Sequence, residues 1–138
     1  MTESDLNILL SELRAEPEET EWLEFKENNG QELGEYISAL SNAACLHNKD
    51  YAYLVFGIND NNHRIVGTNF NLNQKIKGNE NLIPWLTRLL NPKIHFETHD
   101  FIAEGLRVIL FKIQATFNTP VKFSGISYIR IGSYKKRL

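Results

Sequence analysis

Residues 51–58 read YAYLVFGI, an almost entirely apolar run that restricts the possible folds more than any other segment. Its length and its aromatic and β-branched residues indicate a strand, and the lack of polar alternation indicates a strand covered on both faces. With 42% hydrophobic residues, the 138-residue chain can supply such a core. We therefore expect a single domain over residues 1–138. The chain ends on SYKKRL with no predicted element to close it, as a fragment of a longer protein would.

The other segments alternate between helix and strand patterns. Apolar residues that recur every three to four positions predict helices over 5–15, with Ser4 as the N-cap, and over 31–46 and 80–90. Strands are predicted over 21–26, 63–67, 94–103, 106–115 and 126–131. Turns at 59–62 and 104–105 would join consecutive strands as hairpins. Helices interspersed with hairpins indicate an α+β fold, a mixed, largely antiparallel sheet packed with two to three helices.

Charge is distributed unevenly along the chain, although the formal net charge is only −2. Residues 1–35 contain eleven acidic and two basic residues, whereas residues 105–138 contain seven basic residues and no acidic one. A local basic surface attracts phosphate groups whatever the net charge. Two interpretations stay open: this segment faces a nucleic-acid backbone, or its bases pair with the acidic front half.

Several classes of protein are excluded by the composition. The single cysteine, Cys45, rules out an internal disulfide and a cysteine-based zinc cluster. No segment approaches the ~20 apolar residues that span a bilayer, and the N-terminus lacks the order of a signal peptide. The four histidines show no metal-ligand spacing, and no glycine-rich phosphate loop is present. We expect a cytoplasmic protein with no membrane attachment and no cofactor.

Three segments, in this order, resemble the Schlafen/AlbA-like domain family. They are ETEWLEFK at 19–26, LSNAACLHNKDYAYLVFGINDNNHRIVG at 40–67 and TPVKFSGISYIRIGS at 119–133. The sequence departs from the family at 47–50, where His-Asn-Lys-Asp replaces the usual Gly-Gly pair. The resemblance implies a DNA-binding domain of the kind found at the N-terminus of bacterial transcriptional regulators. Because members of the family frequently pair, it also implies a homodimer.

The candidate nucleic-acid site lies on the last predicted strand and the tail. Tyr128 and Arg130 alternate and so share one face, and an arginine beside an aromatic ring suits phosphate contact with base stacking. The turn at 132–133 offers backbone and hydroxyl donors to a phosphate. The full set expected to contact a DNA or RNA backbone is Lys26, Tyr128, Arg130, Ser133, Lys135, Lys136 and Arg137. In the competing interpretation Arg130 pairs with a carboxylate such as Glu24, and 135–137 form a frayed tail.

Two other functions are weighed against nucleic-acid binding. Nuclease relatives imply a metal-dependent endoribonuclease, in which Glu19, Glu24 and Asp60 would be the catalytic residues and the ligands of Mg²⁺ or Mn²⁺. Asn59 is a second match for the aspartate position, and an amide there would weaken metal binding. The last alternative is a non-catalytic interaction domain that self-associates through an exposed strand edge at 126–131.

Overall fold

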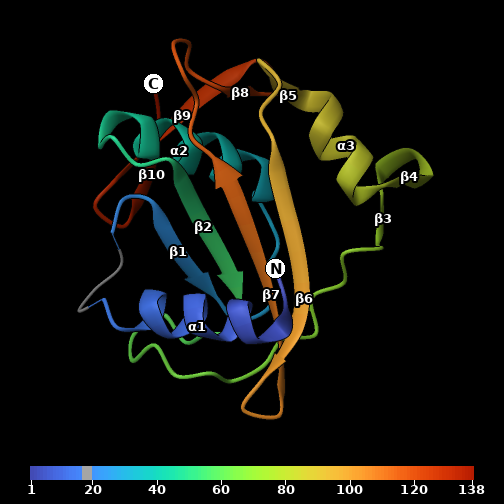
Figure 1. The fold of residues 1–138 in the computed structure, drawn as a ribbon. Helices are drawn as coiled ribbons and strands as arrows, with labels where there is room; N and C mark the ends of the chain where they lie inside the picture. The colour runs from blue at the N-terminus through green and yellow to red at the C-terminus, as the bar shows by residue number, and fades with distance from the viewer. Residues whose placement is uncertain (17–19) are drawn as a thin grey trace.

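The computed structural model of the chain describes residues 1–16 and 20–138, with Lys77 described by its backbone only. The centre of the fold is a four-stranded sheet with the order β1-β2-β7-β6 (Figure 1). Its strands are β1 (Leu23–Lys26), β2 (Tyr51–Phe56), β6 (Phe96–Ala103) and β7 (Leu106–Gln114). β2 pairs in parallel with β1 and antiparallel with β7, so the apolar run forms an interior strand, as predicted.

Helices cover both faces of this sheet, α1 (Glu3–Arg14) on one and α2 (Leu33–Leu46) on the other (Figure 1). Successive residues of β2 divide between two cores because side chains alternate along a strand. Val55 packs with the leucines of α1, while Leu54 and Phe56 pack with the apolar stripe of α2. The continuous apolar composition of β2 is therefore explained by its cover on both sides.

Helix α2 also contacts a second sheet, with the order β10-β9-β8-β5. Its strands are β5 (Leu90–Asn91), β8 (Lys122–Phe123), β9 (Ile126–Ile131) and β10 (Tyr134–Arg137). Two polar side chains of α2, both buried, bind the backbone of β9 and of Val121, which directly precedes β8. Ser38 Oγ donates to the carbonyl of Val121 over 2.7 Å, and Asn42 Nδ2 donates to the carbonyl of Tyr128 over 2.7 Å. The position of the second sheet thus depends on these hydrogen bonds as well as on apolar packing.

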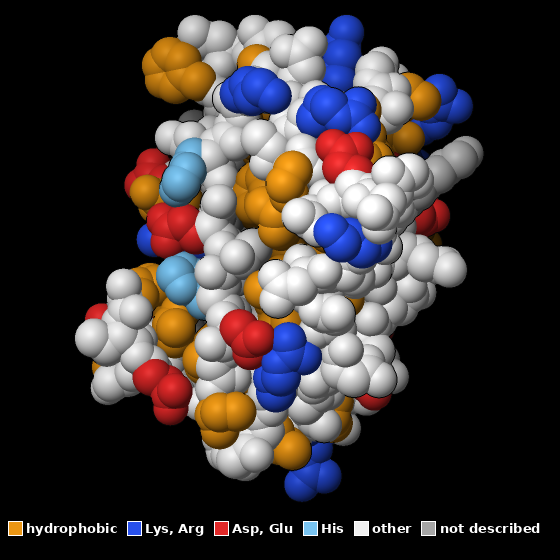
Figure 2. Space-filling model, turned by 90° about the vertical axis from the view of Figure 1, so that its right-hand side faces the viewer, with side chains coloured by type: hydrophobic (Ala, Val, Ile, Leu, Met, Phe, Trp, Pro, Cys, Tyr) orange, Lys and Arg blue, Asp and Glu red, His pale blue; other side chains and the backbone are white. Residues whose placement is uncertain are grey.

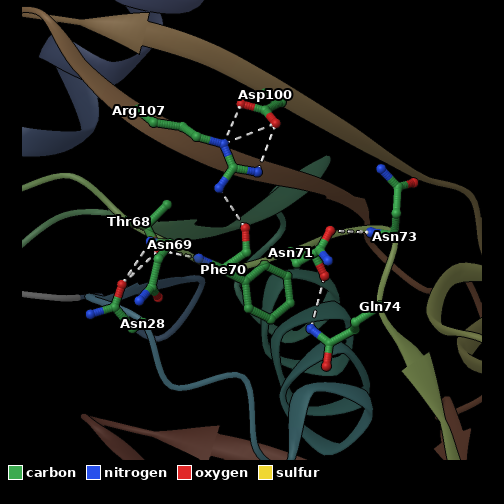
Figure 3. A network of polar contacts seen from close by, with 9 residues as sticks. All are labelled: Asn28, Thr68, Asn69, Phe70, Asn71, Asn73, Gln74, Asp100 and Arg107. Atoms are coloured by element: carbon green, nitrogen blue, oxygen red, sulfur yellow. Dashed lines mark hydrogen bonds and ion pairs between the residues drawn. The ribbon is translucent and has the colours of Figure 1, made fainter.

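A long loop leads from β2 to a small third unit made of β3 (Lys75–Ile76), a 3₁₀ turn (Lys77–Asn79), β4 (Glu80–Asn81) and α3 (Leu82–Leu89). Figure 3 shows the polar network that anchors this loop. Asn28 Oδ1 accepts hydrogen bonds from Thr68 Oγ1 and from the N–H of Asn69, and Arg107 donates to the carbonyl of Phe70. The ring of Phe70 thereby stacks on Phe56 with a centroid distance of 4.2 Å.

The α+β class is confirmed, and so is the hairpin that joins β6 to β7. Three local predictions are wrong. The segment 63–67 forms no strand, because Ile65 makes only an isolated bridge to Ile58. The N-cap of α1 is Thr2 rather than Ser4, in a reciprocal capping box with Asp5. The tail is not frayed, since residues 134–137 form strand β10 against β9.

Candidate nucleic-acid interface

Arg130 lies on the inner face of the second sheet and is only 1% exposed. Its Nη2 lies 2.8 Å from Glu24 Oε1, and its Nη1 donates to the carbonyls of Thr20 and Leu23 over 2.8 and 3.0 Å. Tyr128, on the same face, is 9% exposed. The pairing of Arg130 with Glu24 is therefore confirmed, and this depth does not suit a phosphate contact by either predicted residue. Arg130 instead fastens the second sheet to β1.

Lys135 and Lys26 also engage acidic side chains on the inner side. Lys135 is the cross-strand neighbour of Arg130, and its Nζ lies 2.9 Å from Glu32 Oε2 and 2.6 Å from Glu35 Oε1. Lys26 Nζ lies 3.9 Å from Glu24 Oε2. The ammonium groups of both lysines also face the ring of Tyr36. The acidic front half thus neutralises this part of the predicted basic set.

On the outer face of the second sheet, the cations are exposed and are not neutralised in this way. Cross-strand pairing places Lys136 beside Ile129, Tyr134 beside Ile131, and Lys122 beside Ser127, all on the face away from Arg130. Lys122 and Lys136 are exposed, and Tyr134 is 72% exposed. The four strands contain no acidic residue. Within the described residues, no carboxylate pairs with Lys122, Lys136 or Arg137.

The charges on a neighbouring side of the molecule are visible in Figure 2. Lys and Arg side chains gather at the upper end of this view, the end at which β5 and β8 lie in Figure 1, and acidic side chains lie mostly below them. On the side drawn in Figure 2, the upper end is therefore the more basic one.

The turn between β9 and β10 carries Gly132 and Ser133. Gly132 has a φ of 59°, and its N–H donates to Glu21 Oε2 over 3.2 Å, so this donor already has a partner. Ser133 is exposed and remains available. A Gly-Ser pair between two strand-like runs is a hairpin signal, and it could have revealed β10 from the sequence. The same signal would have placed Tyr134 on the face opposite to Arg130. Tyr134 and Lys122 are the two outer-face residues absent from the predicted set.

Lys135 and Glu32 shift each other's pKa. Burial by itself lowers the pKa of Lys135, but its hydrogen bonds to Glu35 and Glu32 outweigh burial, so the net pKa is raised. The pKa of Glu32 is lowered, mainly by the hydrogen bond from Lys135 and then by its charge. Both shifts mean that the folded state favours the charged pair, which joins β10 to the start of α2.

This coupling predicts a pH dependence of the contact between β10 and α2. Because the folded pKa of Glu32 is lowered, its contribution is present above the ordinary glutamate range and is lost as the pH falls through the lowered pKa. Because the pKa of Lys135 is raised, its contribution disappears as the pH rises through the raised value. In ¹³C NMR, the Glu32 carboxyl carbon should titrate at a lower pH in the native protein than in Lys135→Met. Equal midpoints would contradict the coupling.

Of the three residues of the nuclease alternative, the structure describes Glu24 and Asp60. Glu24 is bound to Arg130, Asp60 is exposed in its turn, and Glu19 lies outside the described residues. Asn59, rather than Asp60, reaches the end of β1, where its Nδ2 donates to Glu27 Oε2 over 3.0 Å. Among the residues described, no group of three or more histidine, cysteine, aspartate or glutamate side chains is arranged to hold a metal ion.

Sequence and structure comparisons identify the family. The family described as Schlafen, AlbA_2 matches residues 19–138, so the chain belongs to this family. The match includes both the first strand, with Glu24, and the second sheet, with Arg130. Both residues of this ion pair therefore lie within the matched region.

Two solved structures share the fold. The DIP2311 protein from Corynebacterium diphtheriae has a TM-score of 0.51 at 18% identity over 98% of this chain, which spans 27% of that protein's chain. The N-terminal domain of a RecG-related protein from Nitrosomonas europaea has a TM-score of 0.50 at 20% identity, over 96% of this chain and 92% of that domain. No curated protein matches the chain. In the described residues, no helix is long and apolar enough to cross a membrane.

Proposed function

We propose that this domain binds nucleic acid through the outer face of the second sheet. The observation that carries the proposal is the difference in charge neutralisation between the two faces of the second sheet. Cations on the inner face are neutralised by Glu24, Glu32 and Glu35, whereas Lys122 and Lys136 on the outer face have no carboxylate partner among the described residues. Unpaired cations on an acid-free surface are what a polyanion requires.

The contacts are to the phosphate backbone, with little dependence on base sequence. Lys122 and Lys136 supply the charges on the outer face, and Ser133 supplies a hydroxyl donor. Arg137 pairs with Tyr128 and so lies on the other face of β10, where it is exposed at the edge of the sheet and adds a charge beside this surface. Membership of the family supports a nucleic-acid partner. The similar domain from Nitrosomonas europaea belongs to a protein described as related to an ATP-dependent DNA helicase, which supports DNA as that partner. A role as the recognition module of a bacterial transcriptional regulator is part of the proposal.

The proposal includes no metal ion or other cofactor. A divalent metal would need the carboxylate of Glu24, which the Arg130 guanidinium holds at 2.8 Å. Binding should therefore persist in EDTA. A nuclease would instead degrade RNA when Mg²⁺ or Mn²⁺ is added, and would lose this activity in Glu24→Gln.

Self-association through residues 126–131 does not fit the sheet order, because β9 is an interior strand between β8 and β10. The edge strand beside β9 is β10, which carries Lys135, Lys136 and Arg137. Antiparallel pairing of two copies along this edge would place like charges opposite one another, which is unfavourable, and lysines at an edge generally prevent such pairing. If two copies form the proposed homodimer, we expect their contact to lie elsewhere.

The salt dependence of binding tests the proposal. Each phosphate contact contributes roughly −0.9 to the log–log slope on duplex DNA and roughly −0.7 on single strands. The double variant Lys122→Ala/Lys136→Ala should bind more weakly, with a slope shallower by about 1.4 to 1.8, in fluorescence anisotropy titrations.

A matched control is Arg64→Ala/Lys75→Ala. It removes the same charge from exposed positions that lie off the second sheet. It should keep the native slope. Equal slopes for the two double variants, or no binding to DNA or RNA at low salt, would contradict the proposed surface.

A further inference from the structure

An apolar pocket of about 260 Å³ lies beside the outer face of the second sheet. It is formed by the end of α2, the loop before β8, and β9 with the end of the chain. Its main lining residues are Cys45, Leu46, Asn118, Pro120, Ile129 and Leu138. Leu46 and Leu138 are 70% and 67% exposed, so the apolar rim is open to solvent. The pocket is therefore accessible to a ligand from outside.

The proposed phosphate-binding cations border this pocket. Ile129, which lines it, is the direct cross-strand neighbour of Lys136. Leu138 follows Arg137, and its N–H donates to the carbonyl of Ser127 over 2.9 Å. Ser127 in turn pairs with Lys122. A phosphate held by these cations therefore lies next to an apolar recess.

We propose that the pocket receives an unpaired base, so that the domain prefers single-stranded nucleic acid. This inference rests on the proposed function and adds the class of ligand. The faces of a base are apolar and suit an apolar recess, while the flanking phosphates suit the bordering cations. The bases of a duplex are stacked and paired, so they cannot enter. The exposed ring of Tyr134 offers a stacking surface for a neighbouring base.

The polar groups of the pocket predict little discrimination between bases. Asn42 lies at its floor, but its amide already donates to the carbonyls of Val121 and Tyr128, and its oxygen accepts the N–H of Val121. The exposed polar side chains of the lining are those of Asn118 and Thr119, both in the loop before β8. An apolar recess without a free polar group at its floor admits any base of suitable size. The selectivity is then for unpaired strands rather than for a sequence.

The single cysteine of the chain provides a reporter for this pocket. Cys45 lines the pocket and is partly exposed. We expect a twelve-nucleotide oligothymidine to bind more tightly than a twelve-base-pair duplex at the same salt. We also expect it to slow the alkylation of Cys45 by N-ethylmaleimide several-fold, as followed by mass spectrometry. The duplex should leave the alkylation rate unchanged even when it is bound.

A variant pair tests the rim. The double variant Leu46→Ala/Leu138→Ala removes two exposed apolar side chains from the rim. It should weaken oligothymidine binding about tenfold, which is within the range for the loss of one base-stacking contact. Binding of the duplex should change little. Ile8→Ala, at a 58% exposed position on α1, is the matched control and should change neither affinity.

The outcomes separate this inference from the proposed function. Equal affinity for both oligonucleotides without protection of Cys45 would overturn the base pocket and leave phosphate binding intact. No binding to either would overturn the proposed function. Protection of Cys45 that grows with protein concentration in the absence of nucleic acid would also overturn the inference, because a second copy would then cover the pocket.

Discussion

Replacing Arg130 with alanine is expected to lower the free energy of unfolding by about 3–5 kcal/mol. The guanidinium is buried, bonded to Glu24 and to the carbonyls of Thr20 and Leu23. Its removal leaves the carboxylate of Glu24, itself only 8% exposed, without this partner in a site of low dielectric. The second sheet would also lose its main polar attachment to β1.

Urea denaturation followed by circular dichroism measures this loss. Lys136→Ala, one pleat away on β10 but exposed, is the control and should change stability by no more than about 0.5 kcal/mol. Replacing both partners, in Glu24→Gln/Arg130→Met, should cost less than Arg130→Ala alone, because no buried charge is left. If Arg130→Ala kept native stability but lost nucleic-acid binding, the buried structural role would be wrong.

Replacing Gly34 with alanine is expected to destabilise the domain by about 1–3 kcal/mol, the usual cost of overpacking a core. Helix propensity alone predicts the opposite sign, since alanine is favoured over glycine in a helix by about 1 kcal/mol. Gly34 is buried in the first turn of α2, and a methyl group there would overlap the ring of Phe123 on β8. The close approach of helix to sheet therefore requires glycine.

Thermal denaturation can check both the sign and the cause. Ser11→Ala, at an exposed position of α1, changes helix propensity without overpacking and should be neutral or slightly stabilising. Phe123→Leu should recover part of the loss when combined with Gly34→Ala, because the smaller side chain vacates the space. A Gly34→Ala variant more stable than the native protein would show that α2 does not pack this closely on β8.

Local patterns predicted most of the fold. The leucine spacing of α1, the apolar stripe of α2 and the uniform hydrophobicity of β2 each depend on interactions that repeat along the chain, so the sequence alone indicates them. The segment 63–67 forms no strand because its pairing is limited to the single bridge between Ile65 and Ile58. Gly57 accepts the N–H groups of Val66 and Gly67 instead, in a compact loop. Such contacts leave no periodic trace.

The candidate site was only partly predictable. Alternation along β9 correctly placed Tyr128 and Arg130 on one face, but alternation does not reveal which face is buried. The inner face was fixed by partners distant in sequence, Glu24 for Arg130 and Glu32 with Glu35 for Lys135. The proposed contacts therefore moved to the opposite face, with Lys122 added and Tyr134 in place of Tyr128.

The sequence by itself determined that the final third of the chain is basic and free of acidic residues. It could not determine which of those charges are available to a ligand. Only the tertiary structure decided this, because the carboxylates that neutralise the inner cations lie about a hundred residues earlier in the chain and reach them only when β1 and α2 pack against the second sheet. Coulomb attraction acts across space, so pairing depends on the fold rather than on sequence order.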